Sequence, residues 1–322
     1  MDSSREPIKP GHLAHKSSGA SPLTQGEHKR LAAIRHIALD LDDTLYRGQK
    51  LFPESLPFLQ LLDSLGIGYS FVTNNSSRSV SEYLAHFERI GLKATRDQVL
   101  ISSHAAARKI QKLFPDIRRI FIVGAHGMAE ELALSGFECV TENPEAIFIG
   151  YDPDLNFQSL CKAAWWIKKG LPFIATNPDR TCPTDSEHIY IDCGAVCAAL
   201  REATGRSPDI IAGKPDPTLL QIVMDTHRLA PNELAMVGDR LETDIAMGRR
   251  ASAASVLVLT GEFGRTAQQD PAHCIPAIGS LHRPDFIFPN LEAFARELMV
   301  QQNFDLLRLS TNKNSVTNGE GS

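Results

Sequence analysis

The chain has 322 residues, of which 43% are hydrophobic and 22% are charged, the balance of an ordinary globular protein. This length allows two domains, or one large α/β unit that carries an insertion. The net charge of −5 comes with no basic stretch, which argues against a nucleic acid polymer as the main partner. An anionic substrate would therefore need local positive charge or a metal ion.

The two ends of the chain are polar and rich in small residues. Residues 1–30 contain no apolar core of a signal peptide, and residues 304–322 have a similar composition, so both segments are predicted to be flexible tails. No stretch approaches the ~20 apolar residues that a membrane span needs. The six cysteines are scattered, which favours reduced thiols, a cytoplasmic location and no zinc site.

Between the tails, apolar runs that predict strands alternate with apolar residues at helical spacing. A long loop is predicted at residues 177–192. In chain order the predicted elements are a strand from residue 37, a helix at 58–65, a strand at 69–72, helices at 80–91 and 105–113, a strand at 120–123, a helix at 129–134, a strand at 146–149, a helix at 157–169, a strand at 172–176, helices at 195–204 and from 219, strands at 234–237, 255–259 and 286–288, and a helix at 291–300.

This alternation is typical of an α/β fold with a doubly wound, parallel, Rossmann-like sheet. The middle of the chain has a βαβ pattern of its own, with long connections on either side, which indicates an inserted α/β domain of about a hundred residues. The predicted core therefore covers residues 31–103 and 208–303, and the predicted insertion covers residues 104–207.

Two acidic residues follow the first predicted strand. Asp40 and Asp42 are two positions apart, so their side chains point the same way if the strand persists. They would then converge at the carboxyl edge of the sheet, where open α/β folds bind their ligands. Like charges this close need a neutralising cation, or a proton on one of them. Helix capping or strand termination explains the cluster poorly, so the pair predicts a functional site.

Further polar signatures follow later strands. Taken singly, each has an ordinary reading as a turn, a helix cap or a solvated surface charge. Taken together, they would bring carboxylates, a hydroxyl and an amine to one edge of the sheet, a set that suits Mg²⁺ and a phosphate ester. A carboxylate nucleophile beside a metal forms an aspartyl phosphate. The signatures are Thr73-Asn74-Asn75, Lys214-Pro215, and Gly238-Asp239 with Asp244.

This ordered set of motifs resembles the haloacid dehalogenase superfamily of aspartyl-phosphate hydrolases, over residues 34–298. The resemblance implies that Asp40 is the nucleophile. It implies that Asp42 is the general acid that protonates the leaving oxygen and then the base that activates water. An acid at the second position is shared with the phosphatases and mutases of that superfamily and speaks against its dehalogenase branch.

The resemblance also implies which residues bind the phosphate and the metal. The phosphoryl group would be bound by Thr73, Asn74, Asn75 and Lys214. The Mg²⁺ cofactor would be held by Asp40, the backbone carbonyl of Asp42 and Asp239, with Asp244 close by or acting through water.

The inserted segment resembles the class IIA cap of the same superfamily, through its position, its length and the run at residues 173–179. That subfamily includes 4-nitrophenyl, phosphoglycolate, pyridoxal and nucleotide phosphatases. Its loop after Asn177 faces the substrate, which makes Asp179, Arg180 and Cys182 candidates for specificity, with an ordinary exposed loop as the alternative. Cys182 stands where pyridoxal phosphatases place a histidine, which counts against pyridoxal phosphate.

The sequence thus predicts a Mg²⁺-dependent phosphatase that hydrolyses a small-molecule phosphate monoester through an aspartyl phosphate. Sugar phosphates, nucleotides, phosphoglycolate and glycerol phosphate are all suitable substrates. Two alternatives stay open: a phosphotransferase or phosphomutase with the same chemistry, and a non-catalytic phosphate-binding or scaffold protein. Cap-mediated dimers occur in the resembling subfamily, so analogy predicts a homodimer through the cap.

Overall fold

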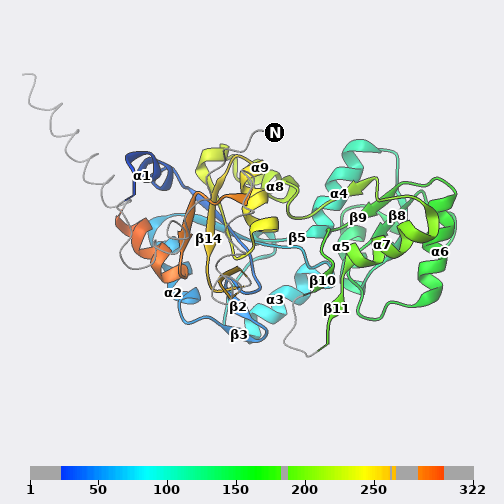
Figure 1. Cartoon of the computed structure of the whole chain (residues 1–322), viewed down its shortest axis with the longest axis horizontal. Helices are drawn as coiled ribbons and strands as arrows, with labels where there is room; N and C mark the ends of the chain where they lie inside the picture. Colours follow the sequence, from blue (N-terminus) through cyan, green and yellow to red (C-terminus); the bar gives the residue numbers. More distant parts are fainter. Residues whose placement is uncertain (1–22, 183–187, 262, 266–281, 301–322) are drawn as a thin grey trace, which may run out of the picture.

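The computed structural model describes residues 23–182, 188–261, 263–265 and 282–300. Its larger lobe, on the left in Figure 1, is built on a six-stranded sheet in the order β15-β14-β13-β1-β4-β5. All pairings in this sheet are parallel, so the predicted Rossmann-like sheet is confirmed. Its strands are β1 (His36–Leu39), β4 (Gly68–Thr73), β5 (Val99–Ile101), β13 (Leu234–Gly238), β14 (Ala254–Val258) and β15 (Phe286–Phe288).

The smaller lobe, on the right in Figure 1, has a second parallel sheet in the order β12-β9-β8-β6-β7. Its strand β12 lies beyond residue 207, where the insertion was predicted to end. The ladder reaches this far because the backbone N–H of Asp209 donates to the carbonyl oxygen of Phe173 at 2.7 Å. Its strands are β6 (Arg119–Val123), β7 (Glu138–Cys139), β8 (Ala146–Ile149), β9 (Phe173–Ala175) and β12 (Ile210–Ile211).

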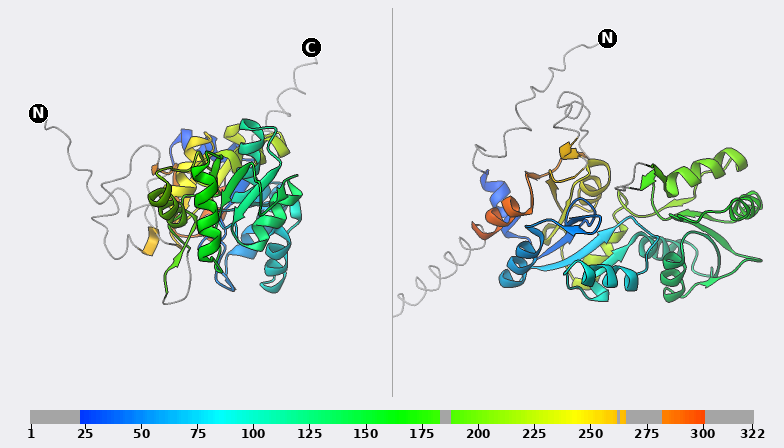
Figure 2. Two further views of the ribbon diagram at one scale, coloured as in Figure 1. Left: turned by 90° about the vertical axis from the view of Figure 1, so that its right-hand side faces the viewer. Right: turned by 90° about the horizontal axis from the view of Figure 1, so that it is seen from below.

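Amphipathic helices flank the two sheets, as the views in Figure 2 show. The helix α3 illustrates why they form: Ser79 and Glu82 make a capping box at its start, and Val80, Tyr83 and Phe87 bury one face. The helices are α1 (Gln25–Ala32), α2 (Ser55–Leu65), α3 (Val80–Arg89), α4 (Ser102–Leu113), α5 (His126–Leu134), α6 (Phe157–Lys168), α7 (Cys193–Thr204), α8 (Thr218–His227) and α9 (Ala246–Arg250), and residues 291–300 are also helical.

Successive residues of β1 contribute to two different hydrophobic clusters, as strand geometry requires. Ile37 and Leu39 belong to the cluster on one face of the larger sheet. Ala38 belongs to the cluster on the other face, and that cluster continues without a break to Phe148 and Ile174 of the smaller sheet. The two lobes therefore share one continuous apolar core on this side of the molecule.

Glu131 of α5 ties the smaller lobe to the larger one. Its buried carboxylate accepts the backbone N–H of Val80 at 2.8 Å and two N–H···O bonds from Arg96, both at 2.8 Å. Its Oε2 also lies 3.0 Å from Nε2 of His104. Beside it, a Cβ added to Gly127 would lie 2.2 Å from the backbone nitrogen of Ser79, so only glycine allows this close approach.

The segments predicted as tails and as a long loop contain structure. The helix α1 begins inside the tail predicted at residues 1–30, because Thr24 and Glu27 form a capping box and Leu31 is buried. The loop predicted at 177–192 contains an antiparallel hairpin of β10 (Thr181–Cys182) and β11 (Tyr190–Ile191). A second hairpin pairs β2 (Tyr46–Arg47) with β3 (Lys50–Leu51).

The rest of the two predicted tails, residues 1–22 and 304–322, lies outside the described residues. Among the helices that are described, none combines the length and the apolar character needed to cross a membrane. The five cysteines of the described part, Cys139, Cys161, Cys182, Cys193 and Cys197, are free thiols.

Candidate active site

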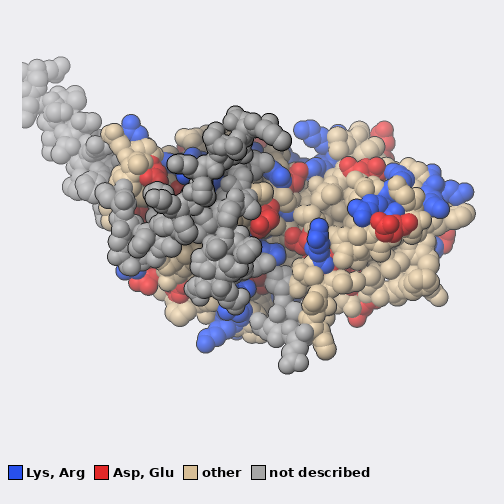
Figure 3. Space-filling view, viewed as in Figure 1, with Lys and Arg blue, Asp and Glu red and all other residues tan. Residues whose placement is uncertain are grey.

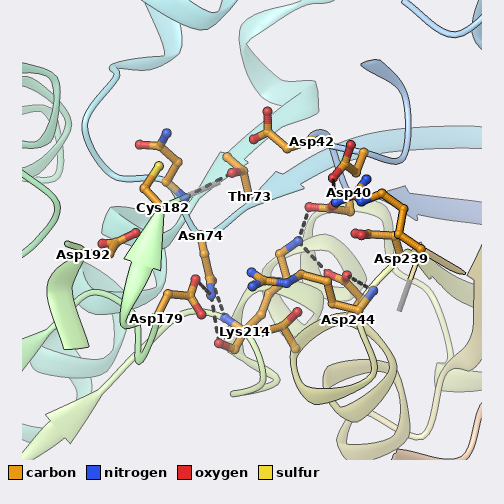
Figure 4. Close-up of a pocket in the computed structure, with 15 residues that line it drawn as sticks. Asp40, Asp42, Thr73, Asn74, Asp179, Cys182, Asp192, Lys214, Asp239 and Asp244 are labelled. Carbon is orange, nitrogen blue, oxygen red and sulfur yellow. Dashed lines mark hydrogen bonds and ion pairs between the residues drawn. The ribbon is translucent and has the colours of Figure 1, made fainter. Parts of the chain in front are cut away.

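Polar side chains from three neighbouring strands meet at one edge of the larger sheet (Figure 4). β1 lies between β13 and β4, and all three run parallel, so their carboxyl ends are adjacent. Asp40 follows β1, Thr73 ends β4 and Asp239 follows β13. The structure therefore brings together the three strand-exit residues that the sequence placed at one edge.

Lys214 lies at the centre of this group. Its side chain is 3% exposed, and its ammonium forms ion pairs with Oδ1 of Asp40 and, at 2.7 Å, with Oδ1 of Asp244. Burial lowers the pKa of Lys214, but the negative charges of Asp244 and Asp40 more than offset this, and the pKa is raised above its ordinary value. The lysine is therefore a fixed positive charge between two buried acids.

A short π-helical turn, η4 (Leu241–Ile245), carries Asp244 into the site. The Oδ2 of Asp244 accepts the backbone N–H of Arg240 at 3.2 Å. A Cβ added to Gly238 would lie 2.3 Å from Cγ of Asp244, so the strand end must be glycine for this carboxylate to fit. Such π turns are frequent at functional sites, because they re-aim one side chain within a helix start.

The donor set at this edge fits a divalent cation. Carboxylate oxygens of Asp40, Asp239 and Asp244 all lie within 4.8 Å of one another, and all three residues are buried. Hard carboxylate oxygens are the ligands that Mg²⁺ prefers, and Mg²⁺ keeps several waters, so a few carboxylates suffice. Three buried acids around a single lysine also carry excess negative charge, which a divalent cation would offset.

Asp40 and Asp42 differ in surroundings although they are two residues apart. Burial raises the pKa of Asp40 to about 7, and the positive charge of Lys214 opposes that rise. Burial also raises the pKa of Asp42, and here the opposing charge is the guanidinium of Arg78. The carboxylate of Asp42 is not part of the three-acid cluster and lines the pocket beside it. The predicted shared direction of the pair depended on the strand continuing through both residues, but β1 ends at Leu39, so strand alternation does not bring the Asp42 carboxylate into the cluster.

Asn74 links the phosphate motif, the lysine loop and the smaller lobe. Its side-chain Oδ1 accepts the backbone N–H of Lys214 at 2.6 Å, and its Nδ2 donates to the carbonyl oxygen of Lys214 at 3.0 Å. The same Nδ2 donates to Oδ2 of Asp179 at 2.9 Å. Next to it, the hydroxyl of Thr73 accepts the backbone N–H of Asn75 at 3.1 Å. The amide group of Asn74 is thus engaged in positioning Lys214.

The smaller lobe covers this edge with residues around the β10–β11 hairpin. Asp179 and Cys182 line the pocket, as the sequence predicted for specificity candidates. Burial raises the pKa of Cys182 to about 12, so its thiol stays protonated at neutral pH. Arg180 is exposed and does not line the pocket, so the prediction that it faces the substrate is not supported. Neighbours in extended backbone lie on opposite sides, and Arg180 takes the solvent side.

The pocket has a volume of about 80 Å³. Several of the residues that line it were not part of any motif in the sequence. Asp192 caps α7 by accepting the N–H of Cys193, and burial raises the pKa of this aspartate to about 6. An acid directly before a helix was the signal that could have singled it out. The lining residues that the sequence analysis missed are Asp192, Arg240, Thr243 and Arg265, whereas Asp43 belongs to the acidic cluster that follows the first strand.

Comparisons with known proteins agree with this geometry. Two family models match the chain: a haloacid dehalogenase-like hydrolase model at residues 37–138 and a second, related hydrolase-like model at residues 211–294. Chronophin of Mus musculus is 31% identical over 257 residues, which cover 74% of this chain and 88% of chronophin. The chain belongs to the haloacid dehalogenase-like hydrolase family.

Solved structures of this family resemble the present one. The 4-nitrophenylphosphatase from Thermotoga maritima is 34% identical with a TM-score of 0.75, over 83% of this chain and 98% of that one. The glycerol phosphate phosphatase from Mycobacterium tuberculosis, in complex with magnesium, is 30% identical with a TM-score of 0.72, over 83% and 77% of the two chains. This haloacid dehalogenase-like hydrolase is a phosphatase of the class IIA subfamily, as its motifs predicted.

Proposed function

We propose that this phosphatase hydrolyses small-molecule phosphate monoesters with Mg²⁺ and through an aspartyl phosphate on Asp40. The observation that carries the proposal is the buried cluster at the sheet edge, in which Asp40 is paired with Lys214 and lies beside Asp239 and Asp244. Asp42 lines the same pocket but is not one of the three clustered acids. One acid is thus suited to attack and the other to proton transfer.

In the first half-reaction the hydroxyl of Thr73 and the ammonium of Lys214 bind the phosphoryl group. An ammonium has three N–H donors. Asp40 and Asp244 take two of them, which leaves the third for a phosphoryl oxygen. A carboxylate oxygen of Asp40 attacks phosphorus as the bond between phosphorus and the leaving oxygen breaks. Asp42 gives its proton to that leaving oxygen.

In the second half-reaction water attacks phosphorus and breaks its bond to the Asp40 oxygen. Asp42, now a carboxylate, takes a proton from this water. Inorganic phosphate leaves, Asp40 returns to a carboxylate and Asp42 returns to an acid. The protons and electron pairs balance over the cycle, and one water is consumed for each ester hydrolysed.

The carboxylates of Asp40, Asp239 and Asp244, with the backbone carbonyl of Asp42, would hold Mg²⁺. When bound, Mg²⁺ supplies positive charge that offsets the repulsion between an anionic phosphate and an attacking carboxylate. Lys214 balances one charge of the three-acid cluster, and its ion pairs hold Asp40 and Asp244 in place. Asn74 in turn fixes the backbone of Lys214.

The smaller lobe restricts access to this site, which favours small substrates. Asp179 and Cys182 come from that lobe and line the pocket, so they are the proposed specificity residues. The homodimer through this lobe is also part of the proposal. It is supported by the exposed apolar side chains of Ile189 and Ile191 at the β10–β11 hairpin, which are 79% and 55% exposed.

Chelation tests the proposed metal dependence. Treatment with EDTA and removal of the chelator should lower the release of phosphate from 4-nitrophenyl phosphate by at least about 100-fold, since an unneutralised acid cluster repels the substrate. Added Mg²⁺ should restore the rate. The Asp239→Asn variant should need a higher Mg²⁺ concentration, whereas Asp63→Asn, on the exposed side of α2, should match the wild type.

Two outcomes would count against the proposed function. Activity that survives exhaustive chelation would remove the role of the metal. Release of less than one free phosphate per 4-nitrophenol, with the missing phosphate found on an alcohol acceptor, would instead support a phosphotransferase.

A further inference from the structure

An open cleft of about 1030 Å³ continues outward from the catalytic pocket. The pocket and the cleft are one connected space, because six residues line both of them. After a phosphate binds beside Asp40, the remainder of the substrate must extend into this cleft. The shared residues are Asp42, Asp43, Asn75, Cys182, Arg240 and Arg265.

The charged side chains of the cleft are mostly positive. Two aspartates line it, Asp42 and Asp43, against four arginines. Asp43 pairs with Arg47 at 2.5 Å and with Arg265 at 2.9 Å, so one acid is shared by two of these arginines. The protein as a whole has a net charge of −5, whereas arginines outnumber acidic residues in the lining of this cleft. Acidic and basic side chains also lie close together where the two lobes meet on the face seen in Figure 3.

Arg78 is the arginine whose guanidinium is best placed to receive an anion. It follows the phosphate motif, before α3, and its side chain is half-buried in the wall of the cleft. Its guanidinium carbon lies 5.9 Å from the centre of the Tyr83 ring. Within the described residues no carboxylate pairs with it. Arg78 and Asp42 line the same cleft, and the positive charge of Arg78 opposes the rise that burial causes in the pKa of Asp42.

We propose that Arg78 binds a second anionic group, a carboxylate or a phosphate, on the leaving portion of the substrate. The inference rests on the proposed function and narrows its substrate class to phosphate monoesters with two anionic groups. Arginine binds both groups through paired N–H donors. A neutral leaving alcohol would leave this guanidinium without an anionic partner, so neutral analogues should be poorer substrates.

Substrate pairs that differ only in charge test the inference. 3-Phosphoglycerate and glycerol 3-phosphate share one carbon skeleton and differ by a carboxylate in place of a hydroxymethyl group. Glucose 1,6-bisphosphate and glucose 6-phosphate differ by one phosphate and provide the second arm. A charge-assisted hydrogen bond should give the doubly anionic member a kcat/KM about 10- to 100-fold higher in at least one pair, mainly through KM.

The Arg78→Gln variant should abolish most of this preference by raising KM for the doubly anionic member, and Arg78→Lys should restore part of it. Any effect of Arg78 on Asp42 is common to both members of a pair and cancels in their ratio. Arg89→Gln is the matched control, since Arg89 is an exposed arginine of α3 outside the cleft. It should leave the ratio at its wild-type value.

The result tests the second anion site separately from the phosphatase mechanism. Turnover of 4-nitrophenyl phosphate without discrimination within either pair, or an equal loss for both members in Arg78→Gln, overturns the second anion site and leaves the phosphatase mechanism standing. No phosphate release from any of these compounds contradicts the proposed function, and the inference falls with it.

Discussion

The Asp40→Asn variant is expected to lose at least about 10⁴-fold in kcat and to keep its fold. Asparagine has the shape of aspartate, but its amide does not attack phosphorus to form an acyl phosphate. Lys214 keeps its partner Asp244 at 2.7 Å, so the buried ammonium is not left alone. Phosphate release at saturating Mg²⁺ measures the first part, and thermal unfolding measures the second.

The same change at an exposed acid is the control for this result. Asp63→Asn on α2 should retain the wild-type rate and melting temperature. Full activity in Asp40→Asn would contradict the mechanism outright. A loss of activity together with loss of the folded state would show instead that Asp40 is structural.

The Glu131→Gln variant is expected to destabilise the protein by about 2 kcal/mol at pH 7. Hydrogen bonds to His104, Val80 and Arg96 lower the pKa of Glu131 to about 2 against the desolvation that burial imposes. An amide would place an N–H donor where the carboxylate accepts several donors. The expected loss of unfolding free energy is smaller than the pKa shift of Glu131 alone would give, because Arg96 is 47% exposed and water screens its charge. Urea unfolding at pH 7 measures the loss.

The pH dependence of that difference follows from the direction of the shift. A folded-state pKa of about 2, below the ordinary value of 4.5, means that Glu131 contributes its full stability above about pH 4.5. The contribution is lost as the pH falls toward 2, so the wild type and Glu131→Gln should converge in stability on acidification. The neighbouring Glu130→Gln should change little, since Glu130 accepts an exposed hydrogen bond from the hydroxyl of Ser81 and no other within the described residues. A constant gap between the wild type and Glu131→Gln from pH 7 to pH 3 would contradict this assignment.

The strands and the positions of the strand-exit residues were predictable because both depend on local sequence. A short apolar run that ends directly at Asp40, Thr73 or Asp239 is enough to indicate a strand and its end. Because ligands bind at the carboxyl ends of parallel strands, these residues were expected at one edge of the sheet. The sequence therefore predicted the candidate site and every strand of the larger sheet except the short β5. Asp42 stands apart from the three-acid cluster because β1 ends at Leu39, before the pair, so the alternation of a strand does not set the direction of its side chain.

Contacts between distant segments could not be predicted in this way. Asn74 and Asp179 are 105 residues apart, and their hydrogen bond depends on how the smaller lobe sits on the larger one. The same is true of Glu131, an ordinary acid in a helical pattern until Arg96 and Val80 surround it. Arg180, in contrast, directly follows Asp179 in the sequence but does not line the pocket.

Two short elements were missed for different reasons. The capping box of Thr24 and Glu27 starts α1 within a composition that resembles a flexible tail. The strand β12 has two residues, too few for an apolar pattern to stand out, and it is recognised by its pairing with β9. For α1 the overall composition outweighed a short capping pattern, and for β12 the information lies in the pairing with a distant strand.

The central claim is that phosphate passes through Asp40, and trapping that intermediate tests it most directly. 4-Nitrophenyl phosphate has a leaving group that needs no acid, so the Asp42→Asn variant should form the aspartyl phosphate and hydrolyse it slowly. Borohydride reduces an acyl phosphate to an alcohol, and peptide mapping by mass spectrometry locates the product. We expect substrate-dependent conversion of residue 40 to homoserine. Phosphate on any other residue, or an unmodified residue 40 in enzyme that is turning over, would contradict it.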